Sequence, residues 1–393
     1  MEKTYQLTWD FWPKKNPLID YPSTTYFCLH TEWFGNRFKV INGDAAYSQG
    51  ATTVNQPAIS LEYSYDGETW MPLVLDTYVE FSNKVFLRGN NELWLRGGDI
   101  QQTGQITAGT LICPRFIVDK NFYVSGKLSS LVQKDITANV TTRLFPCLFY
   151  NQPLLDAQYL QLNFSSLKAN WNNTGTDGPH GLPINLTSLV PSTNYVGPFT
   201  AMFFGCEKLE HAPSLPDFQS SQTISISEFC FAYMFSYCWK LKECMKIDHL
   251  LIASGGYAIC SFMYGDCKAL TAAKALPNFS APNTQRNIPA LYAFYAMFGD
   301  CINLKTMPDM TKYKVSDNSW NIGSFEYMFA RSGVEVSDTQ NEYYKWVVID
   351  VPNNEYMSPL ATYGIFYDTQ GSYKANSALT INAKYYTNIE PIQ

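Results

Sequence analysis

Phe294-Tyr-Ala-Met-Phe-Gly-Asp-Cys-Ile-Asn-Leu304 is the stretch that decides the architecture, because it recurs along the C-terminal half of the chain. Four other segments match it without gaps, beginning at Phe199, Phe231, Cys260 and Phe325. The methionines of the five copies are 32, 29, 34 and 31 residues apart, at Met202, Met234, Met263, Met297 and Met328. Self-similarity at this period is typical of repeat proteins. A weaker copy over 148–155 is expected to open the array.

The shared pattern F-x-x-M-[FY]-x-x-C-x-x-L places Phe, Met and Cys at i, i+3 and i+7, on one face of a short helix. The Leu begins an extended stretch, and in three copies a proline follows, at Pro213, Pro277 and Pro308. Each unit is therefore predicted to hold a turn of helix, a bend and a short strand. Stacked units bury their apolar faces against one another in a continuous core. The predicted repeat core consists of Phe199, Met202, Cys206, Leu209, Phe231, Met234, Cys238, Leu241, Met263, Cys267, Leu270, Phe294, Met297, Cys301, Leu304 and Met328.

The chain ahead of the repeats is predicted to be β-structure. Alternating residues over 58–65 meet Asp66-Gly67, a strong hairpin signal, and the return strand is expected at 70–74. Further strands are expected at 84–88, 93–96, 110–118 and 121–124. Short strands at this spacing indicate a small antiparallel sandwich over 24–128.

Residues 1–23 are interpreted as an N-terminal docking arm. Trp9, Phe11 and Trp12 stand among three prolines without a helical or strand period, and they are the candidate docking residues. The alternative is an N-terminal strand that packs on its own domain. A repeat array at 129–345 and a C-terminal cap at 346–393 complete the predicted organisation.

The repeat signature resembles the BspA-like leucine-rich repeats of bacterial surface proteins and of phages that infect such bacteria. The resemblance covers about 145–345, and segments 63–70, 83–90 and 122–131 are similar to the small β-domain that often precedes these repeats. This chain departs from the pattern at Ser332, which replaces Cys, and after Leu241, where the usual Pro is missing. The resemblance implies an α+β fold, with an N-terminal antiparallel β-sandwich-like domain followed by an irregular leucine-rich-repeat solenoid.

Composition and charge exclude several classes of protein. The net charge is −6, charged residues make up only 16% of the chain, and no basic run supplies the counterion release that nucleic-acid binding needs. Asp10, Pro13 and Lys14 interrupt any apolar stretch near the N-terminus, so we expect no secretory signal. No apolar run approaches the length of a membrane span. A surface short of charge suits a protein that binds neutral partners.

The four repeat cysteines are predicted to occupy one column of the array. Stacked units lie about 5 Å apart, so the first and last thiols are too distant to share one metal ion. None of the ten cysteines forms the local CxxC pair that zinc sites favour. We therefore expect buried, reduced thiols, while the even count keeps disulfides formally open. Asp266 and Asp300, each just before a repeat cysteine, are interpreted as capping residues, with a calcium or sugar site as the alternative.

No motif indicates catalysis or a cofactor. The four histidines show no catalytic spacing, and GxGxxG, GxxxxGK[ST], GxSxG and HExxH are all absent. We therefore expect a protein that is not an enzyme and holds no cofactor and no metal. Exposed aromatic rings stack on sugars and anchor interfaces, which makes Tyr237, Trp239 and Trp346 the candidate ligand contacts, with core packing as the alternative.

These features and the resemblance predict a non-enzymatic phage virion accessory protein, such as a head fibre, a decoration protein or a tail appendage. Its expected partners are capsid or tail proteins of the virion, a host surface glycan or protein, and further copies of the chain in a homo-oligomer. A bacterial cell-surface adhesin of the same repeat type is the alternative, with the cell surface in place of the virion as its location. A glycan-active enzyme with dispersed carboxylates is a third hypothesis.

Overall fold

The computed structural model describes most of the chain between residues 25 and 332. The described segments are 25–45, 60–89, 111–132, 145–164, 167, 197–216, 223–224, 226–253, 257–273, 276–280, 291–304, 308, 324–330 and 332. The predicted arm at 1–23, the strand expected at 93–96 and the predicted cap at 346–393 lie outside them.

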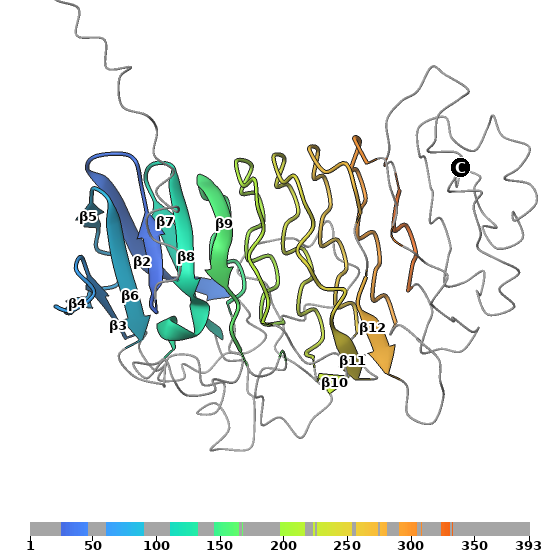
Figure 1. Ribbon diagram of the computed structural model, residues 1–393, viewed down its shortest axis with the longest axis horizontal. Coiled ribbons are helices and arrows are strands. Elements are labelled where there is room, and N and C mark those ends of the chain that lie inside the picture. The colour runs from blue at the N-terminus through green and yellow to red at the C-terminus, as the bar shows by residue number, and fades with distance from the viewer. Residues whose placement is uncertain are drawn as a thin grey trace, which may run out of the picture.

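Strands and turns build the described segments, which contain no α-helix (Figure 1). The helical element among them is a single 3-10 turn, η3 (Leu128–Leu131). The predicted α+β class with a leucine-rich-repeat solenoid is therefore wrong, and an all-β arrangement of several sheets takes its place. The prediction failed because tight turns, described below, reproduce the i, i+3, i+7 spacing that we assigned to a helix.

Two sheets form the N-terminal part. The larger has the strand order β4-β3-β6-β1-β8-β9 and the smaller has the order β5-β2-β7. The strands are β1 (Phe27–His30), β2 (Asn36–Ala45), β3 (Leu61–Ser64), β4 (Met71–Leu73), β5 (Val79–Phe81), β6 (Lys84–Gly89), β7 (Leu111–Val118), β8 (Phe122–Lys127) and β9 (Leu154–Gln161). The fully buried rings of Phe27 in β1 and Phe38 in β2 both pack against Phe116 in β7, with centroids 5.4 and 6.4 Å away. These rings join the two sheets in one core.

The predicted Asp-Gly hairpin is confirmed. Strands β3 and β4 pair antiparallel on either side of it, and Gly67 adopts φ +82°, which a residue without Cβ tolerates. The carboxylate of Asp66 accepts the main-chain N–H groups of Glu68 at 2.8 Å and Thr69 at 2.7 Å. Strands β1, β2 and β5 were not predicted, since their short apolar runs lack a comparable turn signal.

Strand β9 connects these sheets to the repeats. It pairs with β8 in parallel, from Phe122 opposite Leu154 to Lys127 opposite Gln161. On its other side, the N–H of Ala157 donates to the carbonyl of His211 in the next repeat at 3.1 Å. One hydrophobic core runs without interruption from the N-terminal sheets to the last described repeat. The predicted boundary at 128/129 is thus spanned by a shared sheet and a shared core.

The repeat segments lie side by side as strips of tight turns. Alternate N–H groups of one strip donate to the next, as from Phe199 to the carbonyl of Cys230 at 3.0 Å and from Ala201 to that of Ala232 at 2.8 Å. The N–H groups between them close turns within the strip, as from Met202 to the carbonyl of Phe199 at 3.1 Å. We call the strips at 145–152, 197–206, 228–238, 257–267, 291–301 and 324–330 the repeat stack.

Every fourth residue of a strip adopts a left-handed conformation. In the strip at 228–238 these residues are Phe229, Tyr233 and Tyr237, with φ of 53, 57 and 62°. Equivalent residues in the other strips are Cys147, Asn151, Ala201, Gly205, Ala258, Phe262, Asp266, Tyr292, Ala296, Asp300 and Tyr327. A turn period of four brings residues three or four apart to one side, as a helix does. This explains why the apolar pattern was read as helical.

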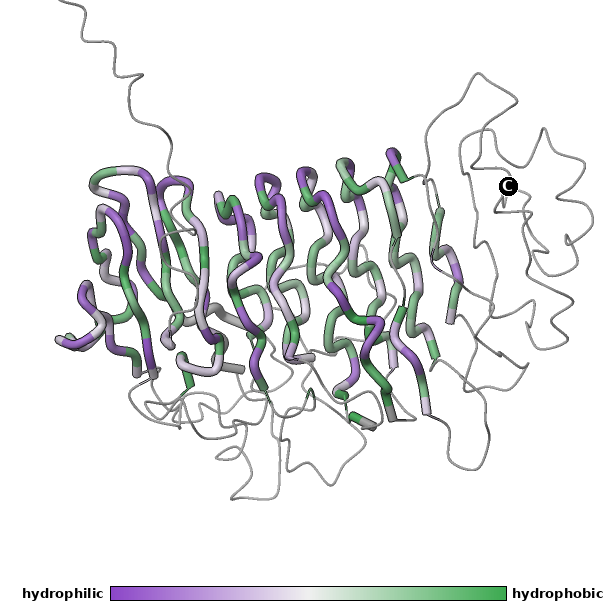
Figure 2. Tube along the Cα trace, in the orientation of Figure 1, coloured by the Kyte–Doolittle hydropathy of each residue, from purple (hydrophilic) through white to green (hydrophobic). Residues whose placement is uncertain are grey.

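After each repeat leucine the chain returns in a more extended form. Strands β10 (Thr223–Ile224), β11 (Leu251–Ala253) and β12 (Asn278–Ser280) form a parallel sheet in these returning segments. Hydrophilic segments lie along the upper edge of the repeat stack (Figure 2). Glu207 and Lys208, in the turn between a strip and its returning segment, are exposed. None of the described segments forms a helix with the length and apolar character that crossing a membrane requires.

Candidate functional site: a tyrosine-rich face of the repeat stack

An aromatic column runs through the inside of the repeat stack. Its rings come from one position in each strip, namely Phe149, Phe203, Phe235, Tyr264, Phe298 and Phe329. Neighbouring centroids lie 5.3–5.6 Å apart and the rings are within 13° of parallel. The one tyrosine of the column, Tyr264, is fully buried, and its hydroxyl accepts the N–H of Met245 at 2.9 Å. Parallel stacking at a constant spacing fixes the register of the strips.

The cysteine column lies beside these rings. Each thiol donates to the carbonyl of the column ring one repeat earlier, as from Cys238 to Phe203 at 3.2 Å and from Cys267 to Phe235 at 3.1 Å. Nine of the ten cysteines have described side chains, and these nine are buried and form no disulfide with one another. Burial raises the pKa of the Cys206 thiol to about 12, so it stays protonated and keeps donating. No cluster of three or more potential metal ligands occurs within the described segments.

All the residues of the predicted repeat core are buried, each with at most 1% of its surface exposed. They line the inside of the stack together with the aromatic column, and they belong to the continuous core. The periodic apolar pattern therefore marks the inner side of each strip, although no helix produces it.

The opposite side of the strips carries a second, smaller hydrophobic cluster. Its buried members are Cys147, Ala201, Phe204, Phe229, Ala232, Tyr233 and Ala258. Half-buried rings pack on this cluster or extend it: Tyr150, Tyr237, Tyr257, Phe262, Tyr292, Tyr295 and Tyr327. We call these seven half-buried rings the tyrosine face.

Ring contacts connect the tyrosine face across successive repeats. Tyr257 meets Tyr292 at 5.8 Å and 85°, Tyr292 meets Tyr295 at 5.6 Å and 84°, and Tyr295 meets Tyr327 at 5.8 Å and 81°. Edge-to-face contacts hold aromatic rings in a defined orientation. Burial raises the pKa of the Tyr292 and Tyr295 phenols, so both remain neutral hydrogen-bonding groups at physiological pH.

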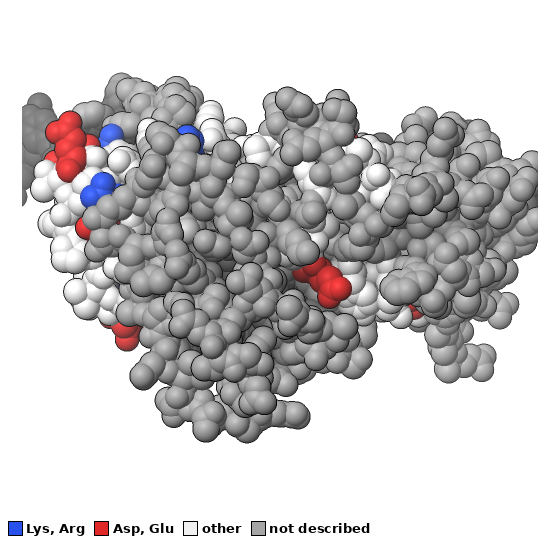
Figure 3. Space-filling model, turned by 90° about the horizontal axis from the view of Figure 1, so that it is seen from below, with Lys and Arg blue, Asp and Glu red and all other residues white. Residues whose placement is uncertain are grey.

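Few charges accompany the tyrosine face. Burial raises the pKa of Glu326, beside Tyr292 and Tyr295, to about 7. At the other end of the stack, the guanidinium of Arg115 lies 4.7 Å over the ring of Tyr150. Seen from below, the Lys and Arg side chains in view lie near the end formed by the N-terminal sheets, whereas Asp and Glu side chains are visible both there and nearer the middle of the molecule (Figure 3). The face is therefore suited to a ligand without strong charge.

The structure separates the predicted ligand contacts. Tyr237 lies on the tyrosine face, whereas Trp239 lies at a tip, where its indole N–H donates to Asp266 at 2.9 Å and Lys268 covers its ring at 4.2 Å. Trp239 is 37% exposed but already engaged by both neighbours. Trp346 and the docking candidates Trp9, Phe11 and Trp12 lie outside the described residues.

Two other interpretations need correction or extension. Asp266 and Asp300 hold left-handed turn positions, with φ of 57 and 62°, so no helix exists for them to cap. The sequence did not single out Tyr150, Tyr257 or Phe262. Phe262 is marked by its left-handed backbone conformation, with φ of 53°. That conformation is a property of the folded chain and has no counterpart in the sequence pattern.

Comparison with known proteins yields no significant match. No protein-family model, curated protein sequence or solved structure is similar to this chain.

Proposed function

We propose that this protein is a non-enzymatic attachment protein that binds a host surface glycan or protein through the tyrosine face. The observation that carries the proposal is the chain of half-buried tyrosine rings that crosses successive repeats. Tyrosine combines a flat apolar ring with a hydroxyl, and it is enriched at interfaces because it adds contact area at a low cost in conformational entropy.

The left-handed turn positions that recur along the repeat stack hold three of these rings in place. Tyr237, Tyr292 and Tyr327 are bulky residues held at φ of 62, 53 and 53°, where Gly or Asn would be relaxed. Strained positions of this kind concentrate at binding sites, where the surrounding structure holds them. The aromatic column behind the face supplies such a rigid support.

The setting that we propose is a phage virion, in which the protein serves as a head fibre, decoration protein or tail appendage. Capsid or tail proteins and further copies of the chain would then be its partners, and Trp9, Phe11 and Trp12 would dock it to the particle. This part rests on the resemblance of the repeats to BspA-like repeats. A bacterial surface adhesin remains the alternative, and mass spectrometry of purified particles against intact cell surfaces distinguishes the two.

Binding to host cells tests the role of the tyrosine face. Labelled full-length protein should sediment with host cells, and the double variant Tyr292→Ser/Tyr295→Ser should lose at least about tenfold in affinity. Tyr78→Ser is the matched control, since this exposed tyrosine lies next to β5 in the N-terminal sheets. Equal binding by the double variant, with an unchanged melting temperature, would rule out the tyrosine face as the attachment surface.

A further inference from the structure

A groove lies on the returning segments of the repeats, and its lining includes none of the residues of the tyrosine face. It has a volume of about 650 Å³, within the usual range for ligand pockets. Three neighbouring segments of the chain line it: β9 with the residues that follow it, residues 211–216, and residues 243–249. Because main-chain hydrogen bonds join β9 to residues 211–214, this groove has a rigid wall.

His211 is held in a fixed orientation at one end of the groove. Its Nδ1 lies 2.6 Å from the carboxylate of Asp156, which also accepts the main-chain N–H of Gln158 at 2.7 Å. The Asp156 side chain is only 10% exposed, while that of His211 is 38% exposed. With Nδ1 engaged by Asp156, Nε2 is the ring nitrogen left to interact with a molecule in the groove.

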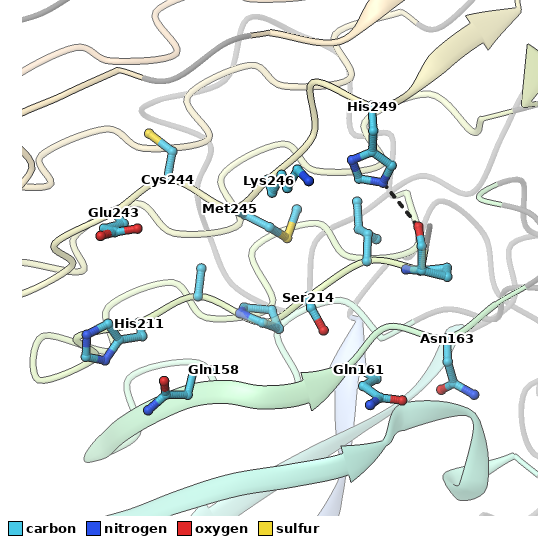
Figure 4. Close-up of a pocket in the computed structure, with 14 residues that line it drawn as sticks. Gln158, Gln161, Asn163, His211, Ser214, Glu243, Cys244, Met245, Lys246 and His249 are labelled. Carbon is cyan, nitrogen blue, oxygen red and sulfur yellow. Dashed lines mark hydrogen bonds between the residues drawn. The ribbon is translucent and has the colours of Figure 1, made fainter. Parts of the chain in front are cut away.

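Side chains that both donate and accept hydrogen bonds line the length of the groove (Figure 4). The amides of Gln158, Gln161 and Asn163 follow one edge, and Ser214 lies between them and Lys246. The amide nitrogen of Gln158 donates to Asp156 at 3.2 Å, and the amide of Asn163 is bonded to Ser129. The side chains of Gln161 and Lys246 form no hydrogen bond with any other residue that the structure describes, so their polar groups remain for a ligand. The amide of Gln161 offers a donor and an acceptor side by side, which matches the paired hydroxyls of a sugar ring.

The charges of the groove balance each other. Glu243 brings one carboxylate and Lys246 one ammonium group, while Asp156 is paired with His211. Such a lining selects neither anions nor cations by long-range attraction. Pro213, Leu215 and Met245 add apolar surface to the lining, and it can contact the C–H groups of a ligand. Polar groups with an apolar patch and no excess charge favour a neutral, hydroxyl-rich molecule.

We propose that this groove binds a neutral saccharide, with Nε2 of His211 and the side-chain carbonyl oxygen of Gln158 fixing one sugar unit and Gln161 and Lys246 contacting the next. This site is distinct from the tyrosine face, because it lies on a different surface and binds the hydroxyl groups of its ligand through hydrogen bonds. It is a binding site for a carbohydrate, and no bond of the ligand is broken in it.

Saturation-transfer NMR with the full-length chain tests the proposal. The probes are the methyl glycosides of glucose, galactose, mannose and N-acetylglucosamine and the disaccharide lactose, with glucuronate and a lysine dipeptide as charged comparisons. At least one neutral sugar should bind, and Gln158→Ala and Lys246→Met should each weaken its Kd about tenfold or more. Both side chains are exposed, so neither change should alter the melting temperature.

Matched controls separate this site from the tyrosine face. Lys240→Met changes an exposed lysine at a tip outside the groove and should leave the Kd unchanged. Tyr292→Ser/Tyr295→Ser should impair attachment to cells but keep sugar binding in the groove. Lack of binding by every neutral sugar, equal binding by the groove variants, or binding of the charged probes alone would overturn the proposal. Release of reducing ends from a bound oligosaccharide would also overturn it, because the groove would then be catalytic.

Discussion

The hydroxyl of Ser332 donates a hydrogen bond to the main-chain carbonyl of Phe298. Cys301, at the same position one repeat earlier, makes the equivalent bond to Tyr264 with its thiol at 3.1 Å. The substitution that breaks the cysteine pattern therefore preserves the contact. A small buried donor, rather than a thiol as such, is what this column of the repeat stack requires.

Cys267 offers a direct test of this requirement. Cys267→Ser keeps a donor toward the carbonyl of Phe235 and should change the free energy of unfolding by less than about 1 kcal/mol. Cys267→Ala removes both the donor and buried volume and should cost about 1–3 kcal/mol. Urea denaturation measures both values. A serine variant as unstable as the alanine variant would show that packing, not the hydrogen bond, maintains the column.

The hydroxyl of Tyr264, and not only its ring, should contribute to the stability of the protein. Tyr264→Phe leaves the stacking intact but removes the acceptor for the N–H of Met245, a buried residue, at an expected cost of about 1–3 kcal/mol. Met245 lies in the returning segment that lacks the usual proline. Unlike a proline, Met245 has a main-chain N–H, and this buried group needs a hydrogen-bond acceptor. Phe235→Leu, one repeat earlier, is the comparison for altered packing alone. Equal unfolding midpoints for Tyr264→Phe and the wild type would contradict the prediction.

The left-handed positions should tolerate glycine better than a β-branched residue. Ala296 is buried at φ 47°, where a side chain branched at Cβ is strongly disfavoured. Ala296→Val should therefore destabilise the protein by about 1–2 kcal/mol, whereas Ala296→Gly should be nearly neutral because it relieves the backbone. Thermal unfolding followed by circular dichroism compares the two. A valine variant as stable as the glycine variant would exclude a left-handed residue here.

Glu326 should make stability depend on pH. Its folded-state pKa is raised from 4.5 to about 7 by burial, so the folded protein retains a proton that the unfolded chain releases. The stabilisation is complete below about pH 4.5 and is lost as the pH rises through about 7. Glu326→Gln removes this loss and should stabilise the protein at about pH 8 by about 1 kcal/mol, a value reduced for the carboxyl's partial exposure. Urea unfolding below about pH 4.5 and at about pH 8 measures whether the variant is more stable than the wild type only at the higher pH. Glu207→Gln, at an exposed tip, is the control.

The sequence reveals the repeats and their buried positions because one inner side of each strip is uniformly apolar. Met263 and Cys267 recur at a fixed spacing, and that spacing survives in the folded chain as the inner columns. The Asp66-Gly67 hairpin was equally predictable, since its turn chemistry is local.

The type of local structure was not predictable from the same pattern. Glycine or asparagine normally reveals a left-handed turn, yet these positions hold residues such as Ala201, Tyr233 and Phe262. Among the described strips, Gly205, Asn151, Asp266 and Asp300 are the residues of a type that commonly adopts this conformation. Of the tyrosine face, the sequence indicated Tyr237 as a ligand contact but not the face as a whole, because a helical interpretation assigns one apolar side to each unit, whereas the turns create two.

The parallel pairing of β8 with β9 gives folding a direction. Strand β9 follows the first strip at 145–152 and lies at the edge of the six-stranded sheet, so its outer edge can serve as a template for residues 210–214, which pair with it. Each later repeat then adds to the edge left by the one before it, in the order in which a ribosome delivers the chain. The chain can thus assemble while it is being synthesised, with only its newest repeat exposing an unpaired edge at any moment.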